Sequence, residues 1–179
     1  IATSTITTGT VVTVNATTTG ADAKVVALSS TKALILYIGT TSFLASMVLD
    51  VSGSTITTNT NLANINTSLV VGAVGLVKIS STKALGVWSE TAANKVKAVI
   101  LTIATSTVTA GAIIEITTSA GSTATSFDMS LLNSSKALVT YSKQTGGQMS
   151  SYILKFETIS DVILAPLFET YIGFTGNNA

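Results

Sequence analysis

Histidine and cysteine are both absent from this chain of 179 residues. Histidine is the commonest general base in enzymes and cysteine supplies the thiol nucleophile, so two main routes to catalysis are closed. Serine is abundant, but no serine lies in a Gly-x-Ser-x-Gly motif and no histidine is present to activate one. Without cysteine the chain can form neither a disulfide nor a thiolate metal site. We therefore expect a protein that is not an enzyme and that holds no metal ion and no cofactor.

Charged side chains are also scarce, at 9% of the residues, and the net charge is +1. All nine basic residues are lysines, and they are dispersed along the chain. Without arginine there is no bidentate fork for phosphate or guanine, so nucleic-acid binding is not expected. The longest apolar runs, such as residues 69–77, are far shorter than the ~20 residues that span a bilayer, so we expect no membrane span.

The polar residues are mostly uncharged, because 32 are threonine and 22 are serine, or 54 of 179. Threonine, valine and isoleucine are β-branched and favour the pleated surface of a sheet. One proline and thirteen glycines exclude a collagen-like sequence. The composition therefore predicts an all-β protein. The chain opens on Ile1 rather than methionine, which we interpret as a processed product or an excerpt of something longer.

A seven-residue phrase that contains Ser-Ser-Thr-Lys-Ala-Leu, or a close variant, occurs three times. Its copies are Leu28–Leu34, Ile79–Leu85 and Leu132–Leu138. The lysines of the phrase are 83 − 32 = 51 and 136 − 83 = 53 residues apart. A second phrase, Ser-Thr-Ile-Thr or Ser-Thr-Val-Thr, keeps nearly the same step at residues 4–7, 54–57 and 106–109. Self-similarity at a fixed period near 50 residues is typical of a repeat architecture.

Each repeat is predicted to form four short antiparallel strands joined by polar turns. In the first repeat we expect these strands near Lys24–Leu28, Lys32–Ile38, Leu44–Val51 and Thr55–Ile65. The three repeats are expected at about residues 24–65, 76–116 and 127–164, with an extra outer strand at 4–14. They form one domain over residues 1–165, and residues 166–179 are a tail or the start of a further module. The inner strands are apolar on both faces, so both faces of each sheet must be covered by protein.

Several of these motifs together resemble a known family. They are the repeated lysine phrase, an aromatic residue five positions after each lysine, the Val-Leu-Asp-Val run at 48–51 and the Ser-Thr-Ile-Thr phrase. With the closing stretch 168–174, they look like the blades of a propeller repeat found in bacteriophage virion proteins. The resemblance covers roughly residues 4–174. It implies a β-propeller-blade-like fold in a structural or adhesion component of a tail fibre or virion appendage, rather than an enzyme.

The same resemblance implies a location on the virion or on an extracellular surface, with other copies of the chain or other virion proteins as partners. However, closed propellers have typically about 4–8 blades, and this chain supplies three repeats. Either the sequence is an excerpt, or two chains join to make six blades. Alternatively, the three repeats close alone as a β-prism or β-trefoil with internal threefold symmetry, although the Gln-x-Trp signature usual in trefoils is missing.

The repeated aromatic residues Tyr37, Trp88 and Tyr141 are candidate ligand-binding residues. Equivalent rings in cleft positions between blades could stack on the sugars of host-surface glycans, whereas rings on apolar strands more often pack between neighbouring sheets. The repeat lysines Lys32, Lys83 and Lys136 could contact an anionic glycan, or simply mark the solvated hairpin end of each repeat.

Three Asn-x-Ser/Thr sequons make Asn15, Asn66 and Asn133 candidate glycosylation sites. In a chain so rich in serine and threonine, such matches also arise by chance. Two classes of function therefore compete with the structural virion component. They are a lectin-like module that binds glycans, and a microbial extracellular filament or surface protein.

Overall fold

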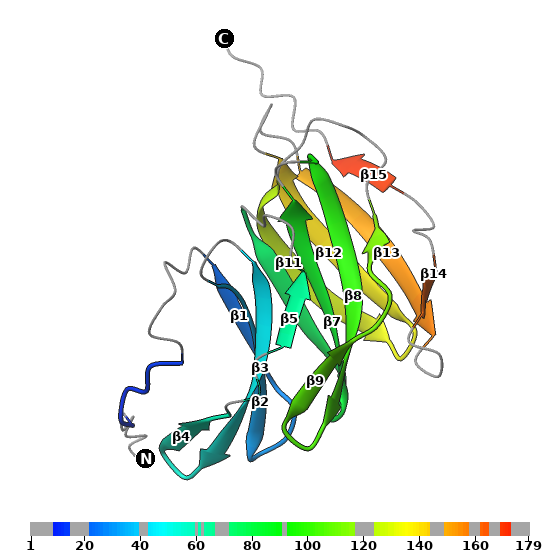
Figure 1. Cartoon of the computed structure of the whole chain (residues 1–179). Coiled ribbons are helices and arrows are strands. Elements are labelled where there is room, and N and C mark those ends of the chain that lie inside the picture. Colours follow the sequence, from blue (N-terminus) through cyan, green and yellow to red (C-terminus); the bar gives the residue numbers. More distant parts are fainter. Residues whose placement is uncertain are drawn as a thin grey trace, which may run out of the picture.

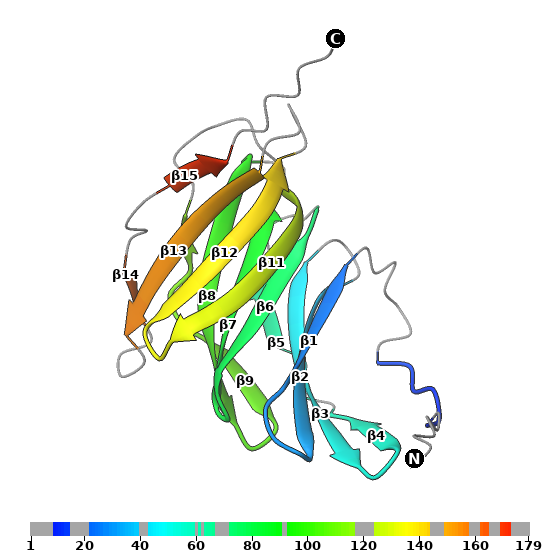
Figure 2. The ribbon, with the colours of Figure 1, turned by 180° about the vertical axis from the view of Figure 1, so that it is seen from behind.

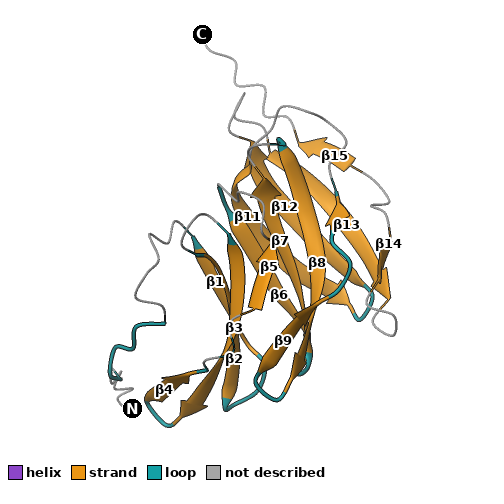
Figure 3. Cartoon of the chain, viewed as in Figure 1, coloured by secondary structure: helices purple, strands orange, loops and turns teal. Residues whose placement is uncertain are grey.

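The structure is a computed structural model that describes residues 9–14, 22–39, 43–59, 61, 63–66, 72–90, 93–116, 124–143, 149–157, 162–164 and 169–172. These residues form strands, turns and loops (Figures 1 and 3). Within them no helix is long and apolar enough to cross a membrane. The all-β class predicted from the composition is confirmed.

The strands form three antiparallel sheets, one for each sequence repeat. The first sheet contains β1 (Ala23–Ala27), β2 (Lys32–Ile38), β3 (Leu44–Ser52), β4 (Thr55–Thr58) and β5 (Ala63–Asn66). The second sheet contains β6 (Val74–Ser80), β7 (Lys83–Glu90), β8 (Lys95–Ala104), β9 (Thr107–Ala110) and β10 (Ile114–Glu115). The third sheet contains β11 (Ala124–Asn133), β12 (Lys136–Lys143), β13 (Met149–Glu157), β14 (Val162–Leu164) and β15 (Glu169–Ile172).

All three sheets share one plan, in which the first three strands form a meander and two short strands share the fourth position. In the first sheet, β4 pairs with the end of β3 and β5 pairs with its beginning. The second sheet places β9 and β10 on β8 in the same way, and the third places β14 and β15 on β13. The single continuous fourth strand that we expected, for example over Thr55–Ile65, is therefore divided in two.

The third sheet extends further along the chain than the sequence predicted. Strand β15 lies in the stretch that we expected to be a separate tail, yet it pairs with β13 from Met149↔Ile172 to Tyr152↔Glu169. The third repeat therefore continues beyond residue 165, and the predicted boundary at that residue is wrong. The extra outer strand expected at 4–14 is not formed in the part described, residues 9–14, and residues 4–8 lie outside the described residues.

The repeated lysine phrase forms the same turn in each sheet. The backbone N–H of Thr31 donates to the Ser29 hydroxyl over 3.2 Å, and that of Thr82 donates likewise to Ser80. In the third repeat Asn133 accepts the equivalent bond from Ser135 over 2.9 Å. Side chains of serine and asparagine stabilise turns by such local bonds. This explains why the polar phrase recurs at the ends of β1, β6 and β11, where the chain turns into the next strand.

The three sheets stack face to face, with the second sheet between the first and the third (Figure 2). We call the face of a sheet that carries the second residue after the repeat lysine its front face. The opposite face, which carries the first residue after that lysine, is the back face. The front face of the first sheet, with Leu34 and Leu36, packs on the back face of the second, with Ala84 and Trp88.

The next interface repeats this arrangement. The front face of the second sheet, with Leu85 and Val87, packs on the back face of the third, with Ala137 and Val139. Each interface buries a continuous apolar core, so the second sheet is covered on both sides, as its doubly apolar strands predicted. The first strands of the sheets lie against one another, β1 against β6 and β6 against β11.

Candidate functional site

The three repeated aromatic residues all lie on the back faces of their sheets, and all are buried. Tyr37 is 5% exposed, Trp88 is 0% exposed and Tyr141 is 2% exposed. Trp88 belongs to the core between the first and second sheets, and Tyr141 to the core between the second and third. A buried ring has no free face for a sugar, so this burial corrects the hypothesis of glycan stacking at these positions. Packing between neighbouring sheets is what the structure shows for Trp88 and Tyr141, whereas Tyr37 is buried on the outer back face of the first sheet.

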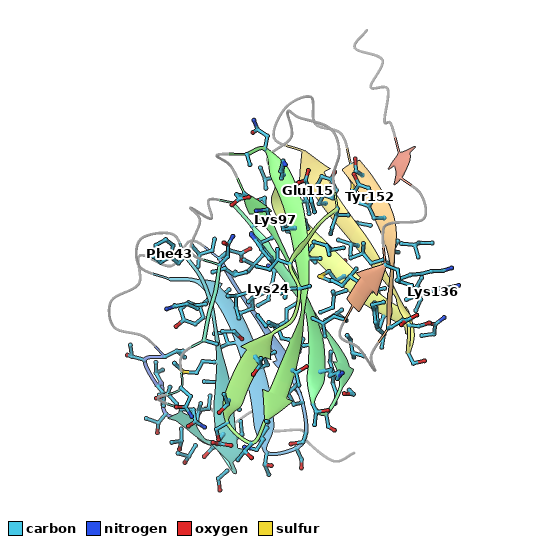
Figure 4. The ribbon with its side chains drawn as sticks, turned by 45° about the vertical axis from the view of Figure 1, so that its right-hand side comes forward. Lys24, Phe43, Lys97, Glu115, Lys136 and Tyr152 are labelled. Carbon is cyan, nitrogen blue, oxygen red and sulfur yellow. The ribbon has the colours of Figure 1, made fainter. Side chains whose placement is uncertain are left out.

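The repeat lysines occupy the same position, as the first residue of the second strand, but their surroundings differ. Lys32 lies opposite Asp50 and donates to its carboxylate over 2.6 Å. Lys83 lies opposite Thr102, and Lys136 lies opposite Lys155. Three equivalent anion sites would need three equivalent environments, and these are an acid, a neutral hydroxyl and a second base. The common feature is the hairpin end, and Figure 4 shows Lys136 on the outer side of the third sheet.

Two of the three candidate glycosylation sites can be placed. The amide nitrogen of Asn66, to which a glycan would be attached, is buried, so Asn66 is not accessible for glycosylation in the folded chain. Asn133 is exposed at the turn between β11 and β12, where its side-chain oxygen accepts bonds from Ser135. Asn15 lies outside the described residues.

A cluster of four charged residues closes one end of the second sheet. Lys97 and Glu90 form an ion pair of 2.5 Å, and Lys95 and Glu115 form another of 2.6 Å. Figure 4 shows Lys97 beside Glu115 at this end. Glu90 is buried, at 4% exposed, so its charge is compensated mainly by Lys97. Each carboxylate has a lysine partner, which leaves the cluster neutral and suited to closing the core.

This cluster was not predicted from the sequence. The sequence did contain a signal for part of it, because Glu90 and Lys95 flank a short turn and are therefore cross-strand neighbours in a hairpin. The pairing of Glu115 with Lys97 depends on the divided fourth strand, which we did not predict. Among the described residues, no three acidic side chains come together to hold a metal ion.

The remaining candidate surfaces are the two outer faces of the stack, which are the back face of the first sheet and the front face of the third. Seven large hydrophobic side chains are exposed among the described residues, and five of them lie on these two faces. Val25 and Ile56 lie on the back face of the first sheet. Leu132, Met149 and Leu164 lie on the front face of the third.

The two outer faces differ in composition. On the back face of the first sheet, every position of β1, β2 and β3 is apolar, whereas Thr58 of β4 and Asn64 of β5 are polar. The strip along β1 is exposed at Ala23, Val25 and Ala27. The centre of this face, formed by Tyr37, Ala45, Met47 and Leu49, is buried. Residues 9–14 lie on this side of the first sheet (Figures 1 and 2), with Gly9 against the backbone oxygen of Ser54.

The front face of the third sheet combines an aliphatic patch with polar positions. The aliphatic patch consists of Leu132, Leu138, Ile153 and Leu164, near the hairpin end. Elsewhere on this face, polar residues replace apolar ones. Ser130 stands where the second sheet has Val77, and Thr140 stands where it has Val87. The third sheet therefore presents a more polar front face than the first two.

Comparisons with family models, with curated proteins and with solved structures find no match to this chain. The resemblance to virion propeller repeats therefore stays a prediction, and the site has to be judged from its own geometry. That geometry places most of the exposed hydrophobic side chains on the outer faces of a three-sheet stack. It places Trp88 and Tyr141 inside the stack, and it places Tyr37, also buried, on the outer back face of the first sheet.

Proposed function

We propose that this chain is a structural module of a virion appendage or tail fibre, which works by assembly and by attachment at an extracellular surface. The observation that carries the proposal is the repeated stacking of front face on back face, which builds two dry cores from one type of sheet. Such stacking gives a stiff unit whose stability is the sum of repeats and their interfaces.

The composition supports the same proposal. A chain with 9% charged residues has little repulsion between copies, which suits a component that is held in an assembly. The virion location comes from the resemblance of the repeated phrases to propeller repeats of virion proteins. Glycan binding is the weaker candidate, because the rings that would stack on a sugar are buried.

The test is to locate the native protein. Antibodies raised against the purified chain would be applied to virions and to surface appendages from the source of the sequence, with immunogold electron microscopy as the readout. We expect label on fibres or other appendages, and loss of label when the antibody is first absorbed with the purified chain. Label confined to the cell interior would contradict the proposal.

A further inference from the structure

The structure contains the same heterologous interface twice, and each of its two halves is left without a sheet partner at one end of the stack. We propose that the back face of the first sheet of one copy stacks on the front face of the third sheet of a second copy, so that the chain self-associates head to tail. This inference rests on the proposed function and deepens it, because it names both the partner and the surfaces of the assembly.

The internal interfaces define what such a contact requires. In both of them a front face meets a back face, with the first strand of one sheet against the first strand of the next. The contact between copies would continue this pattern, with β11 of one copy against β1 of the other. The strip along β1 is available for it, since Ala23, Val25 and Ala27 are all exposed and apolar. The centre of that face, around Tyr37 and Met47, is already buried within the single chain, so the contact between copies is confined to this strip.

Exposure at equivalent positions points to the same two faces. Val25 is 62% exposed, whereas its counterpart in the second sheet, Leu76, is 8% exposed because the first sheet covers it. Met149 on the front face of the third sheet is 43% exposed, whereas its counterparts Leu44 and Val96 are completely buried. The exposed hydrophobic residues are therefore those that an additional sheet of the same type would cover.

The polar residues of the third sheet determine how strong this contact is. Ser130 and Thr140 would lie in the interface, where the internal ones have valine or leucine, so the contact buries less apolar surface than the internal stacking. Asp128, which is exposed on the same face, takes the position of Gly75 in the second sheet and adds a carboxylate to the contact. An interface that mixes apolar and polar area is typical of subunits that associate reversibly. We therefore expect an assembly whose mass depends on protein concentration.

The experiment uses three variants of the whole chain. Val25→Glu changes only the back face of the first sheet, and Leu132→Lys changes only the front face of the third. Ile113→Lys is the control, because Ile113 is also exposed, at 41%, but lies between β9 and β10 at the edge of the second sheet. Association is measured by analytical ultracentrifugation over a wide range of concentration, and circular dichroism and thermal unfolding verify that each variant is folded.

We expect the parent chain and Ile113→Lys to form the same oligomers. Val25→Glu and Leu132→Lys should each weaken association at least about 10-fold. The glutamate would be buried beside Asp128, a group of the same charge, and the lysine would be buried in an aliphatic patch. A mixture of these two variants should form a 1:1 dimer and nothing larger, since each retains one intact face and the two intact faces are complementary. That mixing result separates head-to-tail stacking from a symmetric contact, in which one variant alone would still dimerise.

A parent chain that stays monomeric at every concentration would overturn the inference, as would a loss of association in Ile113→Lys equal to that in the other two variants. Failure of the mixed variants to form the dimer would overturn it as well. The proposed function fails separately, through absence of the protein from appendages. A monomeric chain that labels appendages would retain that function with a different partner.

Discussion

Tyr141 and Tyr152 form a stacked pair inside the core between the second and third sheets. Their ring centroids are 5.7 Å apart with an interplanar angle of 2°, and their hydroxyl oxygens are 3.1 Å apart. The rings come from neighbouring strands, β12 and β13, and both are at most 3% exposed. Tyr141, a candidate sugar-binding residue by its sequence position, therefore links β12 to β13 through a buried hydrogen bond.

Replacing Tyr141 by phenylalanine should lower the free energy of unfolding by about 1–3 kcal/mol, because a buried hydroxyl loses a hydrogen-bond partner. The Tyr141→Phe/Tyr152→Phe double variant should lose less than the sum of the two single variants, since the hydrogen bond can be lost only once. Urea unfolding of all four proteins measures this coupling, and strictly additive effects would show that the two hydroxyls do not interact.

The closest approach of the second and third sheets depends on Gly75. A Cβ added there would lie 2.6 Å from Met129 Sδ and 2.9 Å from Phe127 Cβ, and the second of these atoms cannot move without its backbone. Gly75→Ala should therefore destabilise the chain by about 1–3 kcal/mol, as overpacking does.

Gly86 provides the matched control for this change. An added Cβ at Gly86 would meet the end of the Leu36 side chain at 3.1 Å, which can shift by a few tenths of an ångström. Gly86→Ala should thus be clearly milder than Gly75→Ala in the midpoint of thermal unfolding. The reverse order would contradict the close packing of β6 on β11.

Two equivalent turns contain different residues in the left-handed region of the backbone. Gly53, between β3 and β4, has φ 58°, and Thr105, between β8 and β9, has φ 55°. A β-branched residue is disfavoured there by roughly 1–2 kcal/mol, whereas glycine is not. We expect Thr105→Gly to stabilise the chain, by somewhat less than this amount because the unfolded glycine is more flexible.

The reciprocal exchange, Gly53→Thr, should destabilise the first sheet. Thermal unfolding measures both changes in one series. If both substitutions moved the midpoint in the same direction, the turns would not be equivalent in conformation.

Trp88 is completely buried, and its indole Nε1 has no hydrogen-bond partner among the residues that the structure describes. Trp88→Ala should cost about 3–5 kcal/mol, because it leaves a large cavity between the first and second sheets. Trp88→Phe should cost much less, since it keeps an aromatic ring and removes a donor that makes no bond. Circular dichroism is the suitable readout, because Trp88 is the single tryptophan of the chain. Equal losses in the two variants would indicate that the indole donor does make a bond.

The two ion pairs of the second sheet should respond differently to the loss of one partner. Glu90→Met removes the buried partner of Lys97, whose side chain is only 23% exposed, and should cost about 1–3 kcal/mol. Adding Lys97→Met should recover part of this loss, since two apolar side chains replace the pair. The matched control, Lys95→Met, should cost at most about 1 kcal/mol, because the Lys95–Glu115 pair is much more exposed. Urea unfolding of the parent chain and the three variants measures these effects, and a double variant less stable than Glu90→Met alone would contradict this account.

Much of the fold could be predicted from the sequence, because the repeated phrase carries local information. Lys32, Lys83 and Lys136 each begin the second strand of a sheet, as expected from a polar turn followed by an apolar run. Strand β7 is apolar on both faces, and this pattern correctly indicated that sheets cover it on both sides. Strand β2 has the same pattern, but within the described residues a sheet covers only its front face.

The fourth position of each sheet could not be predicted in the same way. Strands of two to four residues, such as β10 and β15, have no periodicity of their own, and their pairing depends on a long strand far away in the sequence. The surroundings of the candidate site residues were even harder to predict. Alternation shows that Trp88 and Ala84 share a face, but which sheet covers that face is a long-range property, and it decides whether the ring meets a sugar or a core.

The stacking described above has a direction. Each sheet presents its back to the sheet before it and its front to the sheet after it, so an assembly that continues this order has two chemically distinct tips. One tip ends in the back face of the first sheet, with its apolar strip along β1, and the other in the Ser130 and Thr140 side of the third. A fibre built in this way would have two different ends, and growth at one end could be blocked without affecting growth at the other.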